Sequence, residues 1–286
     1  MSDPLAARTD SMAPEGARRL AAVVQPGREC APGDLLPVLW QWAYFPELEP
    51  NEALGGDGHP RRHDEWVERF PRRMAGGGRA KRLAPFVIGE PAERRSELVR
   101  AREREGRQGG RVICDWLHTY SQGGAQVLEE VQTVIYRPPR GPAPSGDEAP
   151  PPKVSEPDQR AWELMRHLEF DPVMLFRFSA ATWNSHRIHY DRPFATQEEG
   201  YAGLLVHGPL LTVLLAREAE GVLGELEEVD FRLQAPTFDT QSVDVFVHQV
   251  NETSCQVEAR KDDGTVAVSL SAVSLSGGKD GSRSSA

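Results

Sequence analysis

The strongest constraint on the fold is one apolar helix followed by a series of long strand-like runs. The segment HGPLLTVLLAREAEG (207–221) places Pro209 where a first helical turn tolerates proline, and Gly221 suits the helix end. Its middle, LLTVLL, is apolar on nearly every side, so this helix must be buried. Alternating apolar and polar residues then predict strands within 226–238, 242–252 and 254–275, and Asp263-Gly264 signals a hairpin in the last run.

A curved antiparallel sheet around one helix buries the apolar surface of both, which is the hotdog architecture. The first half of the chain carries part of the same pattern. Alternating runs at 110–122 and 125–137 flank Gly123-Gly124 and predict a long antiparallel hairpin. The charged stretch 93–106 fits either a strand or a helix. We therefore expect an α+β double hotdog, in which two antiparallel sheets each wrap a central helix.

The clearest boundary is the proline-rich stretch RPPRGPAPSGDEAPPPKVSEP (137–157), because dense proline excludes helices and central strands. The expected organisation is an N-terminal hotdog-like domain, a linker, and a C-terminal hotdog domain, with termini that lack fixed structure. The corresponding ranges are 26–137, 138–157, 158–276, and the termini 1–25 and 277–286. The C-terminal domain is expected to begin with a helix at 156–168 and a strand at 173–182.

Composition narrows the functional classes. The net charge of −10 argues against nucleic acid as a partner, because phosphate binding requires clustered cations. No apolar run reaches the roughly 18 residues of a membrane span, and the N-terminus lacks the apolar core of a secretory signal, so a cytoplasmic location is expected. The scattered cysteines suit buried positions better than a disulfide framework or zinc site: Cys30, Cys114 and Cys255.

Several polar residues that could take part in catalysis lie close together in the segment before the apolar helix. We expect His189 to move a proton and Asn184 to position a water molecule. The amino end of the helix offers unpaired amides at Gly208 and Leu210 that can hold an oxygen gaining negative charge. His207 either caps the helix or orients the loop.

Plainer interpretations stay open for the same cluster. Tyr190-Asp191 can form a simple turn, and His186 can be a surface residue like His167 and His248. A metal site built from His186, His189 and Asp191 is also conceivable. Without further ligands we expect no metal.

The segment FSAATWNSHRIHYDRPFATQEEGYAGLLVHGPLL (178–211) resembles the hydratase motif of MaoC-like and type 2 enoyl-CoA hydratases. It is most similar to the branch that includes mesaconyl-C4-CoA hydratase, itaconyl-CoA hydratase and type 2 hydroxyacyl-thioester dehydratase. LWQWAYF (39–45), FPRRMAGGGR (70–79) and EEVQTVIYR (129–137) extend the resemblance over about 35–275 and suggest a fatty-acid-synthase-type dehydratase N-terminal domain.

The resemblance implies a hydro-lyase that adds water to, or removes it from, an acyl-CoA or acyl-carrier thioester. It implies that His189 is catalytic, that the Gly208 amide serves the thioester oxygen, and that the N-terminal unit lacks the catalytic motif. The pantetheine arm enters as part of the substrate, and no separate cofactor is expected. One residue departs from the wider family: Asn184 stands where aspartate is usual and cannot exchange a proton. The branch itself commonly has asparagine there.

His207, Leu210, Tyr190, Arg187 and Arg73 are the further residues expected to bind substrate. A dicarboxylic acyl group would need a cationic partner, for which the candidates are Arg72, Arg73, Arg187 and Arg232. A hotdog thioesterase and a non-catalytic acyl-thioester binding protein are the alternative functions. Pairing of two chains into a homodimer stays open, because a double hotdog can satisfy that pairing within one chain.

Overall fold

The computed structural model describes residues 5–62, 64–105, 110–139 and 160–275. The first half contains β1 (Leu5–Asp10), α1 (Pro14–Val24), η1 (Trp40–Ala43), η2 (Asn51–Ala53), β2 (Arg72–Arg82), β3 (Ala92–Arg104), β4 (Arg111–Gln122) and β5 (Ala125–Arg137). The second half contains β6 (Glu163–Glu169), α2 (Pro172–Thr182), η3 (Arg187–His189), η4 (Phe194–Glu198), α3 (Gly208–Leu223), β7 (Leu226–Leu233), β8 (Ser242–Asn251), β9 (Ser254–Arg260) and β10 (Val266–Ser274).

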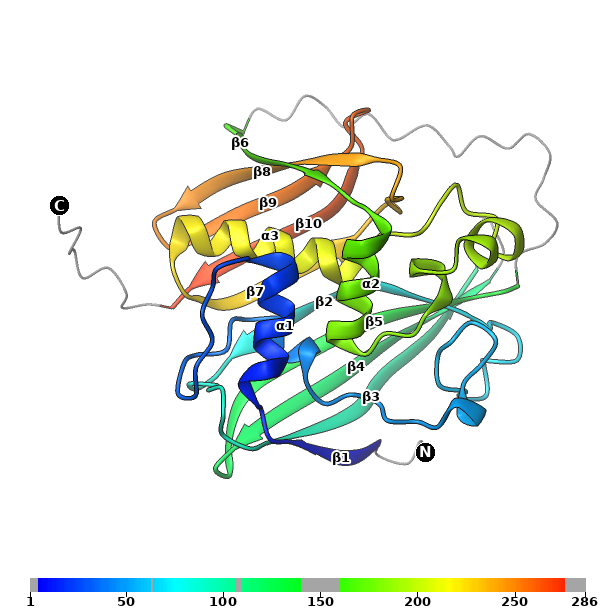
Figure 1. Cartoon of the computed structure of the whole chain (residues 1–286), viewed down its shortest axis with the longest axis horizontal. Coiled ribbons are helices and arrows are strands. Elements are labelled where there is room, and N and C mark those ends of the chain that lie inside the picture. The colour runs from blue at the N-terminus through cyan, green and yellow to red at the C-terminus, as the bar shows by residue number, and fades with distance from the viewer. Residues whose placement is uncertain (1–4, 63, 106–109, 140–159, 276–286) are drawn as a thin grey trace.

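The strands form one antiparallel sheet in which the second half of the chain repeats the first. The strand order is β1-β3-β4-β5-β2-β7-β10-β9-β8-β6. Each half therefore has the same internal order, and the two halves meet where β2 pairs with β7, with Ala80 opposite Val229. The helices α1, α2 and α3 lie on one face of this sheet (Figure 1). This arrangement confirms the predicted α+β double hotdog and joins the two expected sheets edge to edge.

The buried helix predicted in the second half is α3. Seven consecutive residues from Leu210 to Ala216 are all buried, and the helix contacts β7, β8, β9 and β10. The hairpin predicted in the first half is β4 and β5, joined at Gly123-Gly124. The undecided charged stretch is strand β3, which pairs with β1 and β4.

The N-terminal residues were expected to lack fixed structure, and this expectation is wrong for residues 5–24. β1 pairs with β3, and α1 begins with Pro14 in its first turn. Leu20 and Val24 of α1 are buried, and the helix packs on α2 and α3. The apolar side chains of α1 recur at helical spacing and join the main core. The proposed linker beyond residue 139 and the C-terminal tail lie outside the described residues.

Two expected elements at the start of the C-terminal unit are the reverse of what forms. The stretch expected to be a helix ends in strand β6, because Leu168 and its neighbours pair with Val243 and β8. The stretch expected to be a strand is helix α2. Its start is marked by Asp171, whose carboxylate accepts a hydrogen bond from the Met174 amide, and by Pro172 at the first helical position.

The glycine run at 76–78 is part of strand β2. A Cβ on Gly77 would lie 2.5 Å from the carbonyl oxygen of Phe231, so glycine allows β2 to pair closely with β7. Beyond the glycines, Arg79 and Lys81 pair with Glu228. These ion pairs connect β2 with β7, so the two side chains are poor candidates for phosphate binding.

A buried carboxylate organises the core of the N-terminal unit. Glu130 on β5 has no exposed surface and accepts hydrogen bonds from four side chains. The donors are Gln41 at 3.0 Å, Trp42 at 2.6 Å, Tyr120 at 2.7 Å and Gln132 at 2.6 Å. The polar residues of the WQW segment and of the EEVQ segment thus meet at one buried carboxyl group, which ties η1 to the sheet.

The cysteines behave as the sequence suggested. Cys30, Cys114 and Cys255 are buried and free, and burial raises the pKa of the Cys255 thiol to about 12. Within the described ranges, no helix has the length and apolar character needed to cross a bilayer.

Candidate active site

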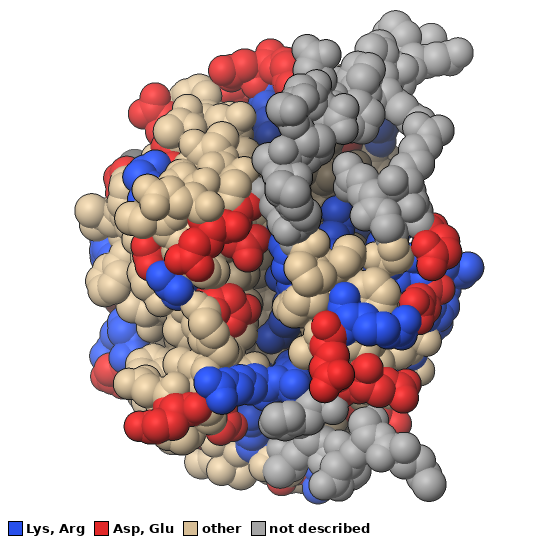
Figure 2. All heavy atoms as spheres, turned by 90° about the vertical axis from the view of Figure 1, so that its right-hand side faces the viewer, with Lys and Arg blue, Asp and Glu red and all other residues tan. Residues whose placement is uncertain are grey.

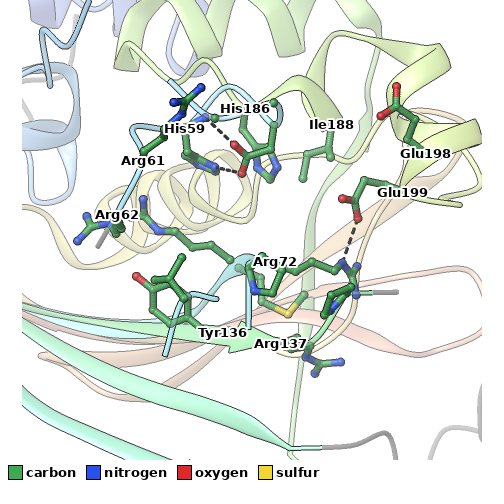
Figure 3. A pocket seen from close by; sticks show the side chains of 18 of the residues that line it. His59, Arg61, Arg62, Arg72, Tyr136, Arg137, His186, Ile188, Glu198 and Glu199 are labelled. Atoms are coloured by element: carbon green, nitrogen blue, oxygen red, sulfur yellow. Dashed lines mark hydrogen bonds and ion pairs between the residues drawn. The ribbon is translucent and has the colours of Figure 1, made fainter. Parts of the chain in front are cut away.

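A cavity of about 630 Å³ lies where loops from the two units meet. Residues of the N-terminal unit that line it include Asp57, His59, Arg62, Arg72 and Arg73, and the C-terminal unit contributes His186, Ile188, Phe194, Glu199 and Tyr201. Figure 2 looks onto the side of the molecule that carries these loops, where basic side chains gather in a hollow. Figure 3 shows that the lining side chains converge from both units.

His189 ends the short helix η3 beside this cavity and is 6% exposed. Its Nδ1 lies 2.7 Å from the carbonyl oxygen of Leu205. A carbonyl can only accept, so Nδ1 carries the hydrogen and Nε2 keeps a free lone pair. Burial lowers the pKa of His189 to about 4. The ring is therefore neutral at pH 7 and is equipped to act as a base.

His207 stacks on His189 and occupies the position before the first residue of helix α3, without a capping hydrogen bond from its side chain. The two rings are stacked with their centroids 3.6 Å apart, and His207 has no exposed surface. Its Nε2 lies 2.9 Å from the hydroxyl of Ser179, and its carbonyl accepts from the Leu211 amide. Among the interpretations left open by the sequence, these contacts favour orientation of the loop over side-chain capping or reaction.

Helix α3 starts directly after His207, so its first amides have no carbonyl to pair with inside the helix. A Cβ on Gly208 would lie 2.4 Å from a methyl carbon of Leu233, so any larger residue here would have to displace the Leu233 side chain. The side chain of Leu210 is fully buried in the core, so only its backbone could face a substrate. A role of the Gly208 and Leu210 amides in holding the thioester oxygen stays a prediction.

Asn184 shapes the loop that carries the histidines. Its side-chain oxygen accepts a hydrogen bond of 3.0 Å from the His186 amide, and its own amide donates to the carbonyl of Ser179. Trp183 immediately before it adopts φ = 54°, which ends α2. The contacts of Asn184 are thus local, and its positioning of a water molecule stays a prediction.

Arg187 and Tyr190 lie in the same loop but point to protein partners. Arg187 pairs with Asp191 at 2.7 Å and stacks over the Phe194 ring. The Tyr190 hydroxyl donates to the carbonyl of Ser185, and Asp191 also accepts from the Phe194 amide. These bonds match the turn interpretation of Tyr190-Asp191. Neither Arg187 nor Tyr190 lines the cavity, whereas Arg73 does.

Two residues of the N-terminal unit enter the site that sequence reasoning did not identify. Asp57 and His59 lie in the loop between η2 and β2, and His59 Nδ1 is 3.0 Å from an Asp57 carboxylate oxygen. The His59 ring lies 4.1 Å from that of His186, which in turn lies 5.5 Å from that of His189. The sequence shows a Gly-Gly-Asp-Gly-His loop, but nothing in it links this loop to a motif 130 residues away.

Backbone contacts hold this loop against the histidine motif. The Arg187 amide donates to the carbonyl of Asp57 at 2.9 Å, and the Arg187 guanidinium donates to the carbonyl of Gly56 at 2.8 Å. The Ser185 hydroxyl donates to the carbonyl of Gly58. Arg187 therefore docks the two units together at the site.

Charge and burial separate the ionisation states of these groups. Hydrogen bonds from His59 hold the pKa of Asp57 at about 2 despite its burial, so Asp57 is an anion. Burial lowers the pKa of His186 to about 2 and also lowers the pKa of His59. Arg73 and Arg62 add to the decrease at His59, and the Asp57 carboxylate opposes it.

One trio within the described residues brings possible metal-ligating atoms together: Asp57, His59 and His186, with all such atoms within 4.8 Å of one another. Arg62 and Arg73 place positive charge beside it, which disfavours a cation. It differs from the trio considered from the sequence, since Asp191 is paired with Arg187. The absence of a metal from the reaction stays a prediction.

Replacing Gly58 by alanine is expected to separate the loop from the motif. Gly58 has φ = +91°, and a Cβ there would lie 2.0 Å from the carbonyl oxygen of Ser185. We expect at least a tenfold loss of turnover with a smaller change in the thermal unfolding temperature, because the clash lies at the junction and outside the cores. Gly56→Ala is the control, since a Cβ at Gly56 meets nothing within 4 Å. Equal activities for the two variants would contradict the prediction.

Comparison with known proteins adds to this geometry. The model of the family described as hydroxyacyl-thioester dehydratase type 2 matches residues 39–239. Mesaconyl-C(4)-CoA hydratase of Chloroflexus aurantiacus is 38% identical over 252 residues, which cover 87% of this chain and 88% of that protein.

Solved structures show the same fold. HtdX from Mycobacterium tuberculosis superposes with a TM-score of 0.65 at 17% identity, covering 94% of this chain and 100% of that one. Another Mycobacterium tuberculosis protein, described as having a double hotdog fold, gives a TM-score of 0.56 at 15% identity and covers 96% of both chains.

Proposed function

The chain belongs to the hydroxyacyl-thioester dehydratase type 2 family, and on this premise we propose that it is a hydro-lyase acting on acyl-CoA thioesters. It adds water across the double bond of a 2-enoyl thioester and catalyses the reverse dehydration. The observation that carries this proposal is the buried, neutral His189, with Nδ1 held by the Leu205 carbonyl and the amino end of α3 beside it.

That arrangement supplies two of the functions that hydration needs. Nε2 of His189 takes a proton from water as the water oxygen bonds to C3 of the enoyl group. Electron density then moves onto the thioester oxygen, which the first amides of α3 stabilise as the charge develops. Acid–base groups and amides are sufficient for this chemistry, so the proposal requires no cofactor apart from the thioester's own CoA or carrier pantetheine.

The cavity favours an acyl group that carries a free carboxylate. Arg62 and Arg73 lie beside His59, and among the described residues neither forms an ion pair with a carboxylate. Burial is the main cause that lowers the pKa of Arg73, and repulsion by the charge of Arg62 adds to it. A substrate carboxylate would relieve this repulsion. The name of the Chloroflexus relative denotes an enoyl-CoA of this kind.

A panel of enoyl-CoA esters tests the proposal. We expect loss of enoyl absorbance without release of free thiol, and a kcat/KM for mesaconyl-C4-CoA at least about 10²-fold above that for crotonyl-CoA, because only the former has a charged group to pair with the arginines. Arg73→Met should remove most of that preference, chiefly by lowering kcat/KM for mesaconyl-C4-CoA. Release of thiol would favour the thioesterase alternative, and thermal stabilisation without turnover would favour a binding protein.

A further inference from the structure

Asn184 leaves the hydratase site without the second acid–base group that an aspartate would supply. We propose that His59, oriented by Asp57, is that group, so that the N-terminal unit completes the catalytic site of the C-terminal unit. This inference rests on the proposed hydratase function. It assigns His59 as a catalytic residue that faces the substrate and Asp57 as a positioning residue that acts through it.

The geometry of the pair defines the orientation of the His59 ring. One Asp57 oxygen lies 3.0 Å from Nδ1 of His59, and the other accepts a 3.0 Å hydrogen bond from the His59 amide. The carboxylate is an acceptor, so Nδ1 carries a hydrogen and Nε2 is the atom left for chemistry. Both residues line the cavity, and Figure 3 shows the His59 side chain converging with His186 on the same space.

The position of the pair depends on contacts between the units. The carbonyls of Asp57, Gly56 and Gly58 are all held by the segment 185–187 of the C-terminal unit. The same segment leads directly into His189. The Asp57–His59 pair and His189 are thus held in place by one segment, through one backbone and two side-chain hydrogen bonds to loop carbonyls, and a two-residue acid–base site requires such fixed positions.

His189 and His59 have different hydrogen-bond partners, and this difference suits them to different acid–base roles. His189 has only a backbone carbonyl as partner, whereas His59 has a carboxylate that opposes the lowering of its pKa by burial and by the arginines. His189 therefore suits the base and His59 the acid in the hydration direction. His186 stands between them as a neutral ring, and the charge of His59 is felt at His189.

The proposed step balances. Nε2 of His189 takes one proton from water while the water oxygen forms its bond to C3. The electron pair of the C2–C3 double bond moves toward the carbonyl and gives an enolate. C2 then takes one proton from Nε2 of the His59 imidazolium, and the carbonyl re-forms. The proton gained by His189 returns to His59 through solvent before the next turnover, so the enzyme is unchanged.

The neighbouring cations make this acid responsive to the substrate. His59 faces Asp57 in its own loop, Arg62 beyond it, Arg73 on β2, and His186 and His189 on the opposing segment. Both arginines oppose its protonation. A substrate carboxylate paired with them would remove that opposition. An enoyl-CoA without the carboxylate is therefore expected to lose kcat as well as binding.

The test compares wild type, His59→Gln and Asp57→Asn by steady-state hydration of mesaconyl-C4-CoA across pH. His59→Gln should lower kcat by about 10²–10⁴-fold with little change in KM, and should lose the alkaline fall in activity. Asp57→Asn should move that alkaline fall to lower pH, because an acid without its carboxylate gives up its proton more readily. His167→Gln is the control, since His167 forms a similar 2.7 Å pair with Asp244 on exposed strands.

The outcomes are distinct. A wild-type chain that hydrates no enoyl-CoA would overturn the proposed function and this inference with it. An active wild type whose His59→Gln variant keeps its kcat and alkaline limb would overturn only the role of His59. Reversible loss of activity with a chelator would reassign Asp57, His59 and His186 to a metal. If His59→Gln fails to fold by circular dichroism, the pH shift of Asp57→Asn decides.

Discussion

His189→Asn is expected to lower kcat by about 10²–10⁴-fold in a protein that stays folded, because the general base is lost and its structural bond is kept. The asparagine amide nitrogen occupies nearly the place of imidazole Nδ1 and can still donate to the Leu205 carbonyl, while Nε2 is absent. Enoyl absorbance measures the rate, and circular dichroism confirms folding. On the acid side of the wild-type profile, kcat/KM should rise with pH through the His189 pKa of about 4, below the alkaline fall assigned to His59.

The control for this variant is His248→Asn. His248 also has Nδ1 near a backbone carbonyl, that of Ala161 at 2.9 Å, but lies far along β8. Its replacement should leave turnover unchanged. A His189→Asn enzyme with near wild-type kcat would rule out His189 as the base.

Asparagine is the sharper substitution because alanine has a second effect. The sequence places His189 in a loop, which predicts little packing of its side chain and a fold that tolerates alanine at this position. The structure shows that the packing part of this prediction is wrong, since His189 is buried and stacked on His207. Alanine would leave the Leu205 carbonyl without its donor, at a cost of about 1–3 kcal/mol.

Glu130→Ala is expected to lower the free energy of unfolding by about 3–5 kcal/mol, because it leaves four donors, of which Gln41 and Tyr120 are buried, without their acceptor. The donors belong to η1, β4 and β5, so the loss loosens the connection between η1 and the sheet. Urea titration followed by tryptophan fluorescence measures the shift, and Trp42 is itself one of the donors.

The matched control is Glu129→Ala, one residue earlier on the same strand. Glu129 is exposed, so its removal should change stability by less than about 0.5 kcal/mol. Similar midpoints for the two variants would show that the Glu130 network contributes little to stability.

Much of the C-terminal unit could be predicted because its signals are local. In α3 and in the alternating strands after it, the pattern of a few neighbouring residues predicts which side chains are buried. The stretch that forms β6 has a helix-like local pattern, but its pairing with β8 makes it a strand. The stretch that forms α2 has a strand-like pattern, and its helical signal is the cap at Asp171-Pro172. The N-terminal helix α1 was missed because its short apolar face lies among charged residues.

The candidate site divides in the same way. His189, His207 and Gly208 sit within 20 residues of one another, and their proximity follows from the chain itself. Asp57 and His59 reach the site only because Arg187 and Ser185 bind their loop from across the junction. A contact between residues so far apart is set by the packing of whole units, and no local pattern encodes it.

The repeat within the sheet has a consequence for how such a chain can change. When two identical subunits form a symmetric pair, every mutation appears twice, and both catalytic centres must tolerate it. Here the two halves share one polypeptide and meet at β2 and β7, so each can vary independently of the other. The C-terminal unit carries α3 and the histidine motif. The N-terminal unit is therefore free to vary in the loop residues that it contributes to the cavity. Covalent fusion thus turns a symmetric partner into a source of new specificity.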